Sequence, residues 1–352
     1  MGVDLDQLQL PIVQAPMAGG PSTPQLCAAV SEAGGLGFLA AGYRTPEAVA
    51  SDIESVRSLT GAPFGLNVFV PPGPAGDRAT VEAYARDVVS GEARRAGADV
   101  GEPRHDDDHF DAKIALAARE RIPVVSFTFG LPTAQALEHC KQAGAGVWIT
   151  VTSPAEARDA AAAGADALIA QGVEAGGHRG YFRDDDTAED FGVLALIARL
   201  RRTTDLPLIA TGGISDGEAL AAVLAAGAAA AQIGSALMLT PEAGTSEPHR
   251  RALSRESPTA LTRAFSGRTA RGIVNRFLAE HGGQAPAAYP EVHHLTAPLR
   301  AAARAAGDDQ AINLWAGQAY PLAEALPAAE VVRRLAADAR AALDRARQRL
   351  GP

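Results

Sequence analysis

Cysteine is scarce in this sequence, since only Cys27 and Cys140 occur in a chain of 352 residues. Two cysteines cannot form a framework of several disulfides or a four-thiolate metal site. Their scarcity favours a reducing compartment. The first residues show no basic segment followed by an apolar one, so we expect no secretory signal and predict a cytoplasmic protein.

Long apolar runs and an excess of basic residues are missing too. No apolar run reaches the ~18 residues that a membrane-spanning helix needs. Acidic residues outnumber basic ones by 41 to 32, and the formal net charge is −9. Nucleic acids and anionic membranes select basic surfaces, so we expect neither as a partner.

Aromatic residues are few as well, at 5% of the chain, whereas the 36 glycines are many. The hydrophobic share of 47% and the charged share of 21% are ordinary for a folded protein, which excludes global disorder. An α/β barrel fills about 200–250 residues as one domain. The length therefore fits a barrel with a smaller second unit.

Short apolar runs alternate regularly with amphipathic stretches along the chain. Eight such runs predict strands that are covered on both faces. Helix starts follow at Thr45 and Ser153, each before a proline, and helix ends at Gly144, Gly164 and Gly227. Eight strands that alternate with helices predict an α/β fold, a (β/α)8 TIM barrel, with a doubly wound sheet as the alternative. The strands are expected at 11–17, 36–42, 63–70, 123–130, 146–152, 167–172, 207–213 and 229–238.

Two regions interrupt this alternation. Residues 71–111 are rich in proline and glycine and contain one helical piece at about 80–96. From residue 241 to about 327 the strand pattern stops, which predicts a second, smaller, mainly α-helical domain beside the mouth of the barrel. The barrel itself is expected at 1–240, closed by an amphipathic C-terminal helix at 328–350.

Polar amides and paired glycines follow the predicted strands, at the end of the barrel that carries active sites. Gly212–Gly213 and Gly234–Ser235 follow strands seven and eight, where such barrels bind phosphate with backbone N–H groups. The side-chain amides there could bind the polar edge of a heteroaromatic cofactor. Tight turns and satisfied buried amides are the alternative interpretations. The amides belong to Asn67, Gln171 and Gln232.

His178 is the sharpest catalytic candidate. It lies in a Gly-Gly-His-Arg-Gly loop after strand six, where an imidazole can act as a general acid or base near neutral pH. The histidines at 105 and 109 fall in an acidic loop, so a solvated loop is a better interpretation than a metal site. His293 and His294 are neighbours and do not share a face of a helix. No metal site is predicted.

Five motifs together resemble the nitronate monooxygenase family, once called 2-nitropropane dioxygenases. They are QAPMAGG, the Asn of GLNVFV, QGVEAGGHRG, IATGGISDG and AAAQIGSALM, and they span residues 10 to about 240. A weaker similarity continues through AYP, LTAPLR and LWAGQA, over 289–319. The resemblance implies a TIM barrel with a second, mainly helical domain, and FMN as the cofactor.

The same resemblance implies roles for individual residues. His178 corresponds to the catalytic histidine of the family, and Tyr289 is expected to bind substrate. The chain departs from the related subset at Val292–His294, where a polar pair of the Gln-Asn type is usual. FMN would be held by Ala15, Pro16, Met17, Asn67, Gln171, Gly176, Gly177, Gly212, Gly213, Gln232, Ile233, Gly234 and Ser235.

The implied activity is the oxidation of alkyl nitronates by FMN and O2 to carbonyl compounds and nitrite. Nitroalkanes are a second expected substrate class, with His178 as the base that removes the α-proton; for nitronates it would instead bind the anion. The alternative is an FMN-dependent NAD(P)H oxidoreductase that acts on quinones or enoyl thioesters. A flavin-storage protein and a flavin-free barrel enzyme complete the alternatives. A homodimer is a further prediction.

Overall fold

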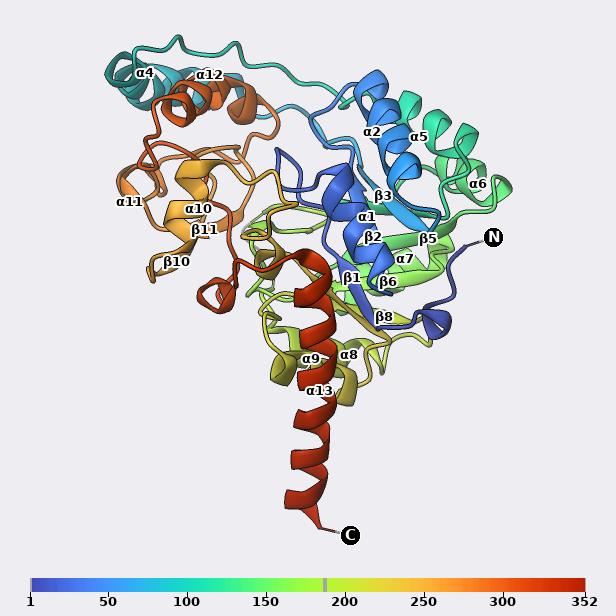
Figure 1. Ribbon diagram of the computed structural model, residues 1–352. Helices are drawn as coiled ribbons and strands as arrows, with labels where there is room; N and C mark the ends of the chain where they lie inside the picture. Colours follow the sequence, from blue (N-terminus) through green and yellow to red (C-terminus); the bar gives the residue numbers. More distant parts are fainter. Residues whose placement is uncertain (1, 186–188, 352) are drawn as a thin grey trace.

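The computed structural model describes residues 2–185 and 189–351 (Figure 1). Within this part, eight parallel strands are hydrogen-bonded in the order β1, β9, β8, β6, β5, β4, β3, β2. The N–H of Gln14 donates to the carbonyl of Leu36 (2.9 Å), and this contact brings the first strand back to the second. The barrel expectation is therefore confirmed. The strands are β1 (Ile12–Gln14), β2 (Gly37–Ala40), β3 (Phe64–Phe69), β4 (Val124–Thr128), β5 (Gly146–Val151), β6 (Ala167–Gln171), β8 (Leu208–Thr211) and β9 (Ala230–Ile233).

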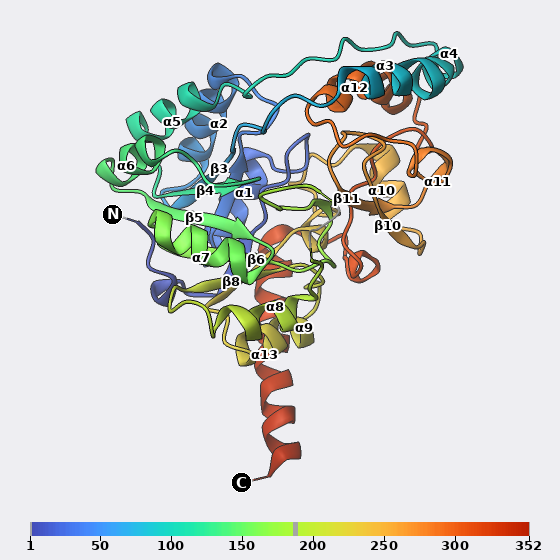
Figure 2. The same cartoon turned by 180° about the vertical axis from the view of Figure 1, so that it is seen from behind.

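Helices between the strands form the outer layer of the barrel (Figure 2). The predicted helix starts are confirmed, because the hydroxyls of Thr45 and Ser153 accept hydrogen bonds from the N–H groups three residues on. Gly144, Gly164 and Gly227 have positive φ and end their helices as expected. These helices are α1 (Pro24–Glu32), α2 (Pro46–Leu59), α5 (Phe110–Arg119), α6 (Ala134–Gln142), α7 (Pro154–Ala163), α8 (Val193–Leu200) and α9 (Gly217–Ala225).

The C-terminal helix α13 (Ala328–Leu350) packs against α9 and α1, between the last and the first strand of the barrel. The contact with α9 is close: a Cβ at Gly217 would lie 2.3 Å from the Cβ of Asp338. The end of α13 projects away from the body of the molecule (Figure 1). None of the helices in the described part of the chain combines the length and the apolar character that crossing a bilayer requires.

Side chains on each strand alternate between the inside of the barrel and the helices around it. Large inward residues such as Phe38, Trp148 and Ile209 form a dry layer deep in the barrel. One inward position further along, at the C-terminal ends of the strands, the side chains are polar. This polar layer is the floor of the site described below, and consists of Asn67, Thr128, Thr150, Gln171, Thr211 and Gln232.

Beside the barrel mouth lies a second group of elements that is not purely helical. The expectation that the strand pattern stops at residue 241 is wrong, because β10 (Thr259–Thr262) and β11 (Ala270–Ile273) form an antiparallel sheet with β7 (Gly177–His178). These strands are only two to four residues long, which is too short for a clear alternation of apolar and polar side chains. The helices of this group are α10 (Glu247–Leu253), α11 (Arg276–His281) and α12 (Glu291–Ala305).

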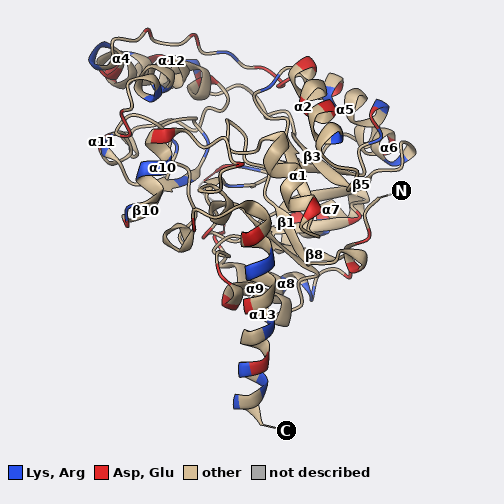
Figure 3. Ribbon diagram, viewed as in Figure 1, with Lys and Arg blue, Asp and Glu red and all other residues tan. Residues whose placement is uncertain are grey.

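The predicted helical piece at 80–96 packs on this second group. It consists of α3 (Arg78–Tyr84), a π-helical turn at 85–89 and α4 (Ser90–Ala96), and it lies against α12 in both views (Figures 1 and 2). Charged side chains lie on the outer helices and are missing from the eight barrel strands, which are tan in Figure 3. Contacts between the outer elements therefore include ion pairs.

One such ion pair joins α4 to α11. The Nη2 and Nη1 atoms of Arg276 lie 2.5 Å and 2.9 Å from the carboxylate oxygens of Glu92, which is 5% exposed. Nε2 of His281 lies 3.2 Å from the same carboxylate. The hydrogen bonds from Arg276 lower the pKa of Glu92 to about 2, against the opposing effect of burial. The carboxylate thus stays charged and depends on Arg276.

Arg276→Met is expected to destabilise the protein because it removes the partner that contacts both carboxylate oxygens of the buried Glu92 and leaves only the longer contacts with His281 and Arg95. We expect the free energy of unfolding to fall by about 3 kcal/mol. The matched control is Arg78→Met, which breaks the exposed pair with Glu82 and should leave the free energy of unfolding nearly unchanged. Denaturant unfolding curves measure both, and equal effects would contradict a structural role for the α4–α11 pair.

Candidate functional site

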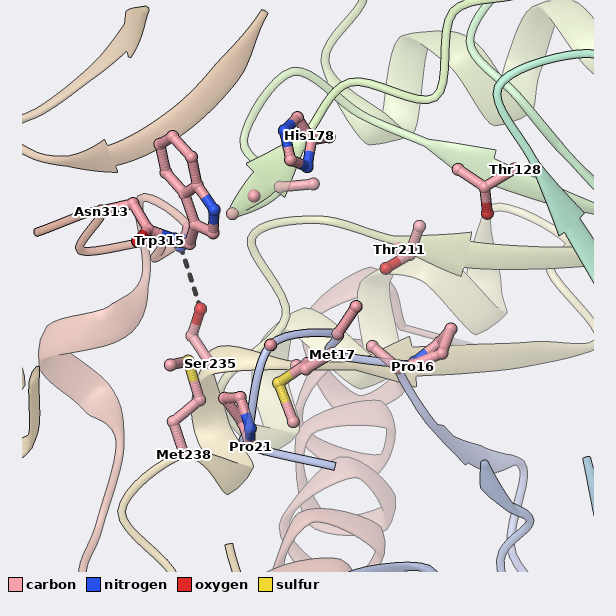
Figure 4. Close-up of a pocket in the computed structure, with 18 of the residues that line it drawn as sticks. Pro16, Met17, Pro21, Thr128, His178, Thr211, Ser235, Met238, Asn313 and Trp315 are labelled. Carbon is pink, nitrogen blue, oxygen red and sulfur yellow. Dashed lines mark hydrogen bonds between the residues drawn. The ribbon is translucent and has the colours of Figure 1, made fainter. Parts of the chain in front are cut away.

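A cavity of about 400 Å³ opens at the C-terminal end of the barrel and extends under the second group of elements. Figure 4 shows its inner face: His178 and Trp315 lie on one side, and Met17, Pro16 and Thr211 on the other. Its position follows from the fold, because the strands end there and the loops after them meet.

Two amides in the floor of the cavity differ in how fully they are bound. Nδ2 of Asn67 donates to Oγ of Ser126 (2.9 Å) and Oγ1 of Thr128 (3.0 Å), which holds this side chain in place. Oε1 of Gln232 is buried without a hydrogen-bond partner among the described residues. A buried polar atom without a partner is costly, so Gln232 has an acceptor ready for a ligand N–H.

Backbone N–H groups form a second polar feature of the cavity, beside the ends of β8 and β9. Within the described part of the chain, no acceptor is hydrogen-bonded to the N–H of Gly213, Gly234 or Ser235, although all three residues line the cavity. Gly213 has φ +71°, a conformation that side chains rarely adopt. Unpaired N–H groups that line one cavity are suited to an anion such as a phosphate.

The loop that carries His178 is bound tightly to the end of β6. Nη1 of the fully buried Arg179 donates to the carbonyl of Gly172 (2.7 Å) and to Oε1 of Gln171 (2.8 Å). Nε2 of Gln171 donates in turn to the carbonyl of His178 (3.1 Å). Opposite, His178 pairs with Ala270 of β11, so the histidine is held between the barrel and the second group.

The imidazole of His178 has one bound and one open nitrogen. Nε2 lies 2.8 Å from Oγ of Ser266, whose hydroxyl donates to the carbonyl of Arg268 (3.2 Å). With the hydroxyl of Ser266 donating to this carbonyl, Nε2 carries the proton and Nδ1 is an acceptor. No described residue hydrogen-bonds Nδ1. This atom is also not fully buried, so it opens onto the cavity that His178 lines.

Burial and charge keep this imidazole neutral. Desolvation lowers the pKa of His178 to about 3; the positive charge of Arg268 acts in the same direction, Asp184 opposes it, and Arg300 adds a smaller lowering effect. The unprotonated imidazole, with the lone pair of Nδ1 open to the cavity, is therefore the form present over the whole physiological pH range.

Aromatic rings enclose His178. Phe129 has φ +83°, a strained conformation for a bulky residue. Its ring lies 5.7 Å from the ring of His178 and 4.5 Å from that of Phe69. The rings of Trp315 and Tyr289 lie 5.5 Å and 5.8 Å from His178. These rings keep water from the imidazole and leave one side of it open to the cavity.

Positive charge gathers on the far side of the cavity. Arg300 and Arg304 of α12 line it, one helical turn apart. The guanidinium of Arg268 lies behind Phe129, 4.1 Å from the centroid of its ring. None of the three forms an ion pair with a described residue. The cavity is therefore cationic, although the chain as a whole is acidic.

Most of the residues expected to line a cofactor site meet in this cavity. Ile233 does not line it: its side chain points outward into the core between strand and helices, as the alternation from Gln232 requires. Tyr289 lies behind the cavity wall, where its hydroxyl donates to that of Tyr43 (3.2 Å). The other expected residues, among them Ala15, Pro16, Met17, Asn67, Gln171, Gly176, Gly177, Gly212 and Gly213, line the cavity.

Several lining residues were not anticipated from the sequence. They lie in loops or on helices that are distant in the chain, and nothing in their local pattern marks them. One of them, His293, carries a signal in the sequence, because it lies in the segment 292–294 where the chain differs from the expected pattern. These residues are Tyr43, Phe69, Phe129, His249, Phe265, Ser266, His293, Arg300, Arg304, Asn313 and Trp315.

Known proteins are similar to this chain along almost its whole length. A sequence model of the nitronate monooxygenase family matches residues 4–338. A nitronate monooxygenase of Paraburkholderia phytofirmans is 41% identical over 349 residues, which cover 96% of this chain and 94% of the relative. A crystal structure of a nitroalkane oxidase from Streptomyces ansochromogenes superposes with a TM-score of 0.94 at 51% identity, covering 97% and 99% of the two chains. FabK from Thermotoga maritima superposes with a TM-score of 0.75 at 25% identity, covering 98% and 97%.

His178 is expected to stay neutral between pH 8 and pH 5, because its lowered pKa lies below this range. ¹⁵N NMR of histidine-labelled protein measures this, with His178→Gln to assign the signals. A protonation midpoint for His178 near the ordinary value of about 6.5 would contradict the geometry described above.

Proposed function

The chain belongs to the nitronate monooxygenase family, and from this premise we propose that the cavity holds FMN and that the enzyme oxidises alkyl nitronates and nitroalkanes to carbonyl compounds and nitrite. The observation that carries the proposal is the meeting, in one cavity, of a neutral His178 and unpaired donors for a phosphate. O2 is the second substrate. The scarcity of cysteine supports a cytoplasmic location, and a homodimer stays a prediction.

Several features of the cavity fit a flavin mononucleotide. The unpaired N–H groups of Gly213, Gly234 and Ser235 would hold its phosphate. The partnerless Oε1 of Gln232 would accept from an N–H on the edge of the ring, and Oδ1 of Asn67 offers a second acceptor. When bound, the flavin accepts electrons from the substrate and passes them to O2.

The chain's own residues supply the proton transfer and the surroundings. The open Nδ1 of His178 accepts the α-proton of a nitroalkane: the C–H bond breaks, an N–H bond forms, and the electron pair moves toward the nitro oxygens. Ser266 and the backbone pairing with Ala270 hold the imidazole in place during this step. A nitronate has already lost this proton, so its oxidation does not require His178 to act as a base.

The proposed domain boundaries follow the packing. The barrel takes residues up to about 240 together with α13, although Met1 and residues 186–188 lie outside the described part. The second unit would consist of residues 241–327. Helices α3 and α4, which precede β4 in the chain, pack against this unit. This arrangement supports the view that the second unit covers the cavity, since residues of α12 and Trp315 line it.

A single series of measurements on the purified protein tests the proposal. We expect a flavin absorption spectrum, FMN as the compound released on denaturation, and rapid O2 consumption with propyl nitronate. The mass of the released compound distinguishes FMN from FAD. Rapid oxidation of NADH or NADPH without a nitronate would favour the alternative oxidoreductase. A yellow protein inert to both donors, or a colourless protein, would overturn the proposal.

His178→Asn is expected to lower kcat for nitroethane by about 10²–10⁴-fold, because the variant lacks the general base. The loss for ethyl nitronate should be at least tenfold smaller, since no proton has to be removed. His139→Asn, on the outer surface of α6, is the control and should change neither rate. O2 consumption measures all rates at equal flavin content. Equal losses for both substrates would contradict a base role for His178.

A further inference from the structure

A second histidine of the cavity, His293, is held in one orientation. It lies in the first turn of α12 and lines the cavity. Its ring stacks on that of Tyr43, with centroids 4.1 Å apart and planes at 7°. The N–H of Tyr43 is bound to Oδ1 of Asp108 (3.1 Å). The stack therefore fixes the plane of the imidazole.

Arg300 determines which nitrogen of His293 carries the proton. Nη2 of Arg300 lies 2.8 Å from the carbonyl oxygen of His293 and 3.3 Å from its Nδ1. A guanidinium is only a donor, so Nδ1 must be the acceptor and the proton must be on Nε2. Burial and the charge of Arg300 lower the pKa of His293 well below its usual value, and the ring stays neutral.

Nε2 of His293 has no partner in the described protein. No described residue hydrogen-bonds this nitrogen, and the atom is not fully buried. It is therefore open to the cavity that the residue lines. The ring of Tyr289, behind the cavity wall, lies 5.8 Å from that of His178 and 6.4 Å from that of His293. Because both histidines line this one cavity, the open acceptor of His178 and the open donor of His293 border the same space.

We propose that His293 binds the substrate, with its Nε2–H donating to a nitro oxygen, and that Arg300 is the positioning residue that selects this tautomer. This inference rests on the proposed function. As His178 removes the α-proton, negative charge moves from the carbon to the nitro oxygens. A fixed donor aimed at these oxygens stabilises the charge where it develops.

Arg300 is well placed for this role because its other contacts leave its charge uncompensated. Nε donates to Oγ1 of Thr296 (3.1 Å), and Nη1 donates to Oδ1 of Asn313 (3.4 Å). Neither partner is charged. The guanidinium therefore polarises the imidazole of His293 and makes Nε2–H a stronger donor than an isolated neutral histidine would offer.

The inference predicts different kinetic effects for the two substrate classes. A nitronate carries its charge before the reaction, so the donor contributes to binding and its loss should appear mainly in KM. A nitroalkane acquires the charge only during deprotonation, so the loss should appear mainly in kcat. A residue that only supports the fold would affect both substrates alike.

His293→Phe removes the donor and keeps the aromatic stack on Tyr43. We expect kcat for nitroethane to fall by about 10²-fold, as for other single donors to a developing oxyanion. KM for ethyl nitronate should rise, with kcat within about threefold of wild type. His293→Gln offers an amide donor and should recover part of the loss. His294→Gln, on a side chain that faces Asp106, is the neighbouring control and should behave as wild type. An unchanged His293→Phe enzyme, or equal losses for both substrates, would overturn the inference.

A spectroscopic measurement separates this inference from the proposed function. ¹⁵N NMR of the flavin-loaded protein should show His293 as the neutral Nε2–H tautomer, assigned with His293→Gln. Arg300→Met should shift the ring toward a mixture of tautomers, whereas Arg300→Lys, which keeps a cationic donor, should retain Nε2–H. An Nδ1–H or charged ring in the wild type would overturn the inference whatever the enzyme oxidises. If neither nitro compound is turned over but the tautomer is as expected, the proposed function fails and the assigned tautomer stands.

Discussion

The buried guanidinium of Arg179 is the contact on which the site depends. Arginine is rarely buried without a close carboxylate, because its charge loses its hydration. Here its hydrogen bonds go to the carbonyl of Gly172 and to the amide of Gln171, and Asp190 is 3.5 Å from its Nε. These bonds hold the loop after β6 against the barrel. The same loop pairs with β11, so one cation fixes His178 and joins the second unit to the barrel.

The alternation of side chains along the strands explains the chemistry of the cavity. Deep inward positions are apolar and fill the barrel, while the next inward positions are amides and hydroxyls. The charged groups come from elsewhere: Arg300 and Arg304 of α12 line the cavity, and Arg268, in a loop, lies behind Phe129. The acidic net charge of the chain therefore does not oppose an anionic substrate, because attraction over a few ångströms is decided by the unpaired guanidiniums nearby.

The eight strands, and most of the residues after them that line the cavity, can be predicted from the sequence because both depend on local patterns. Apolar runs mark the strands, and paired glycines mark the turns after them. The alternation from Gln232 could also have shown that Ile233 points outward. The wall formed by Tyr43, His293 and Arg300 depends instead on how α12 packs on the barrel, which no local pattern encodes. His293 and His294 point apart because they are neighbours on a helix, which argues against a shared site; for the same reason His293 lines the cavity while His294 pairs with Asp106.

A crystal structure of the flavin-loaded protein with butyrate, whose carboxylate has the shape of a nitronate group, tests the central claim most directly. We expect the phosphate on the N–H groups of Gly213 and Ser235. One carboxylate oxygen should accept from Nε2 of His293, with the adjoining carbon facing Nδ1 of His178. A flavin whose phosphate lies elsewhere, or a carboxylate bound away from both histidines, would contradict the assignment of this cavity as the active site.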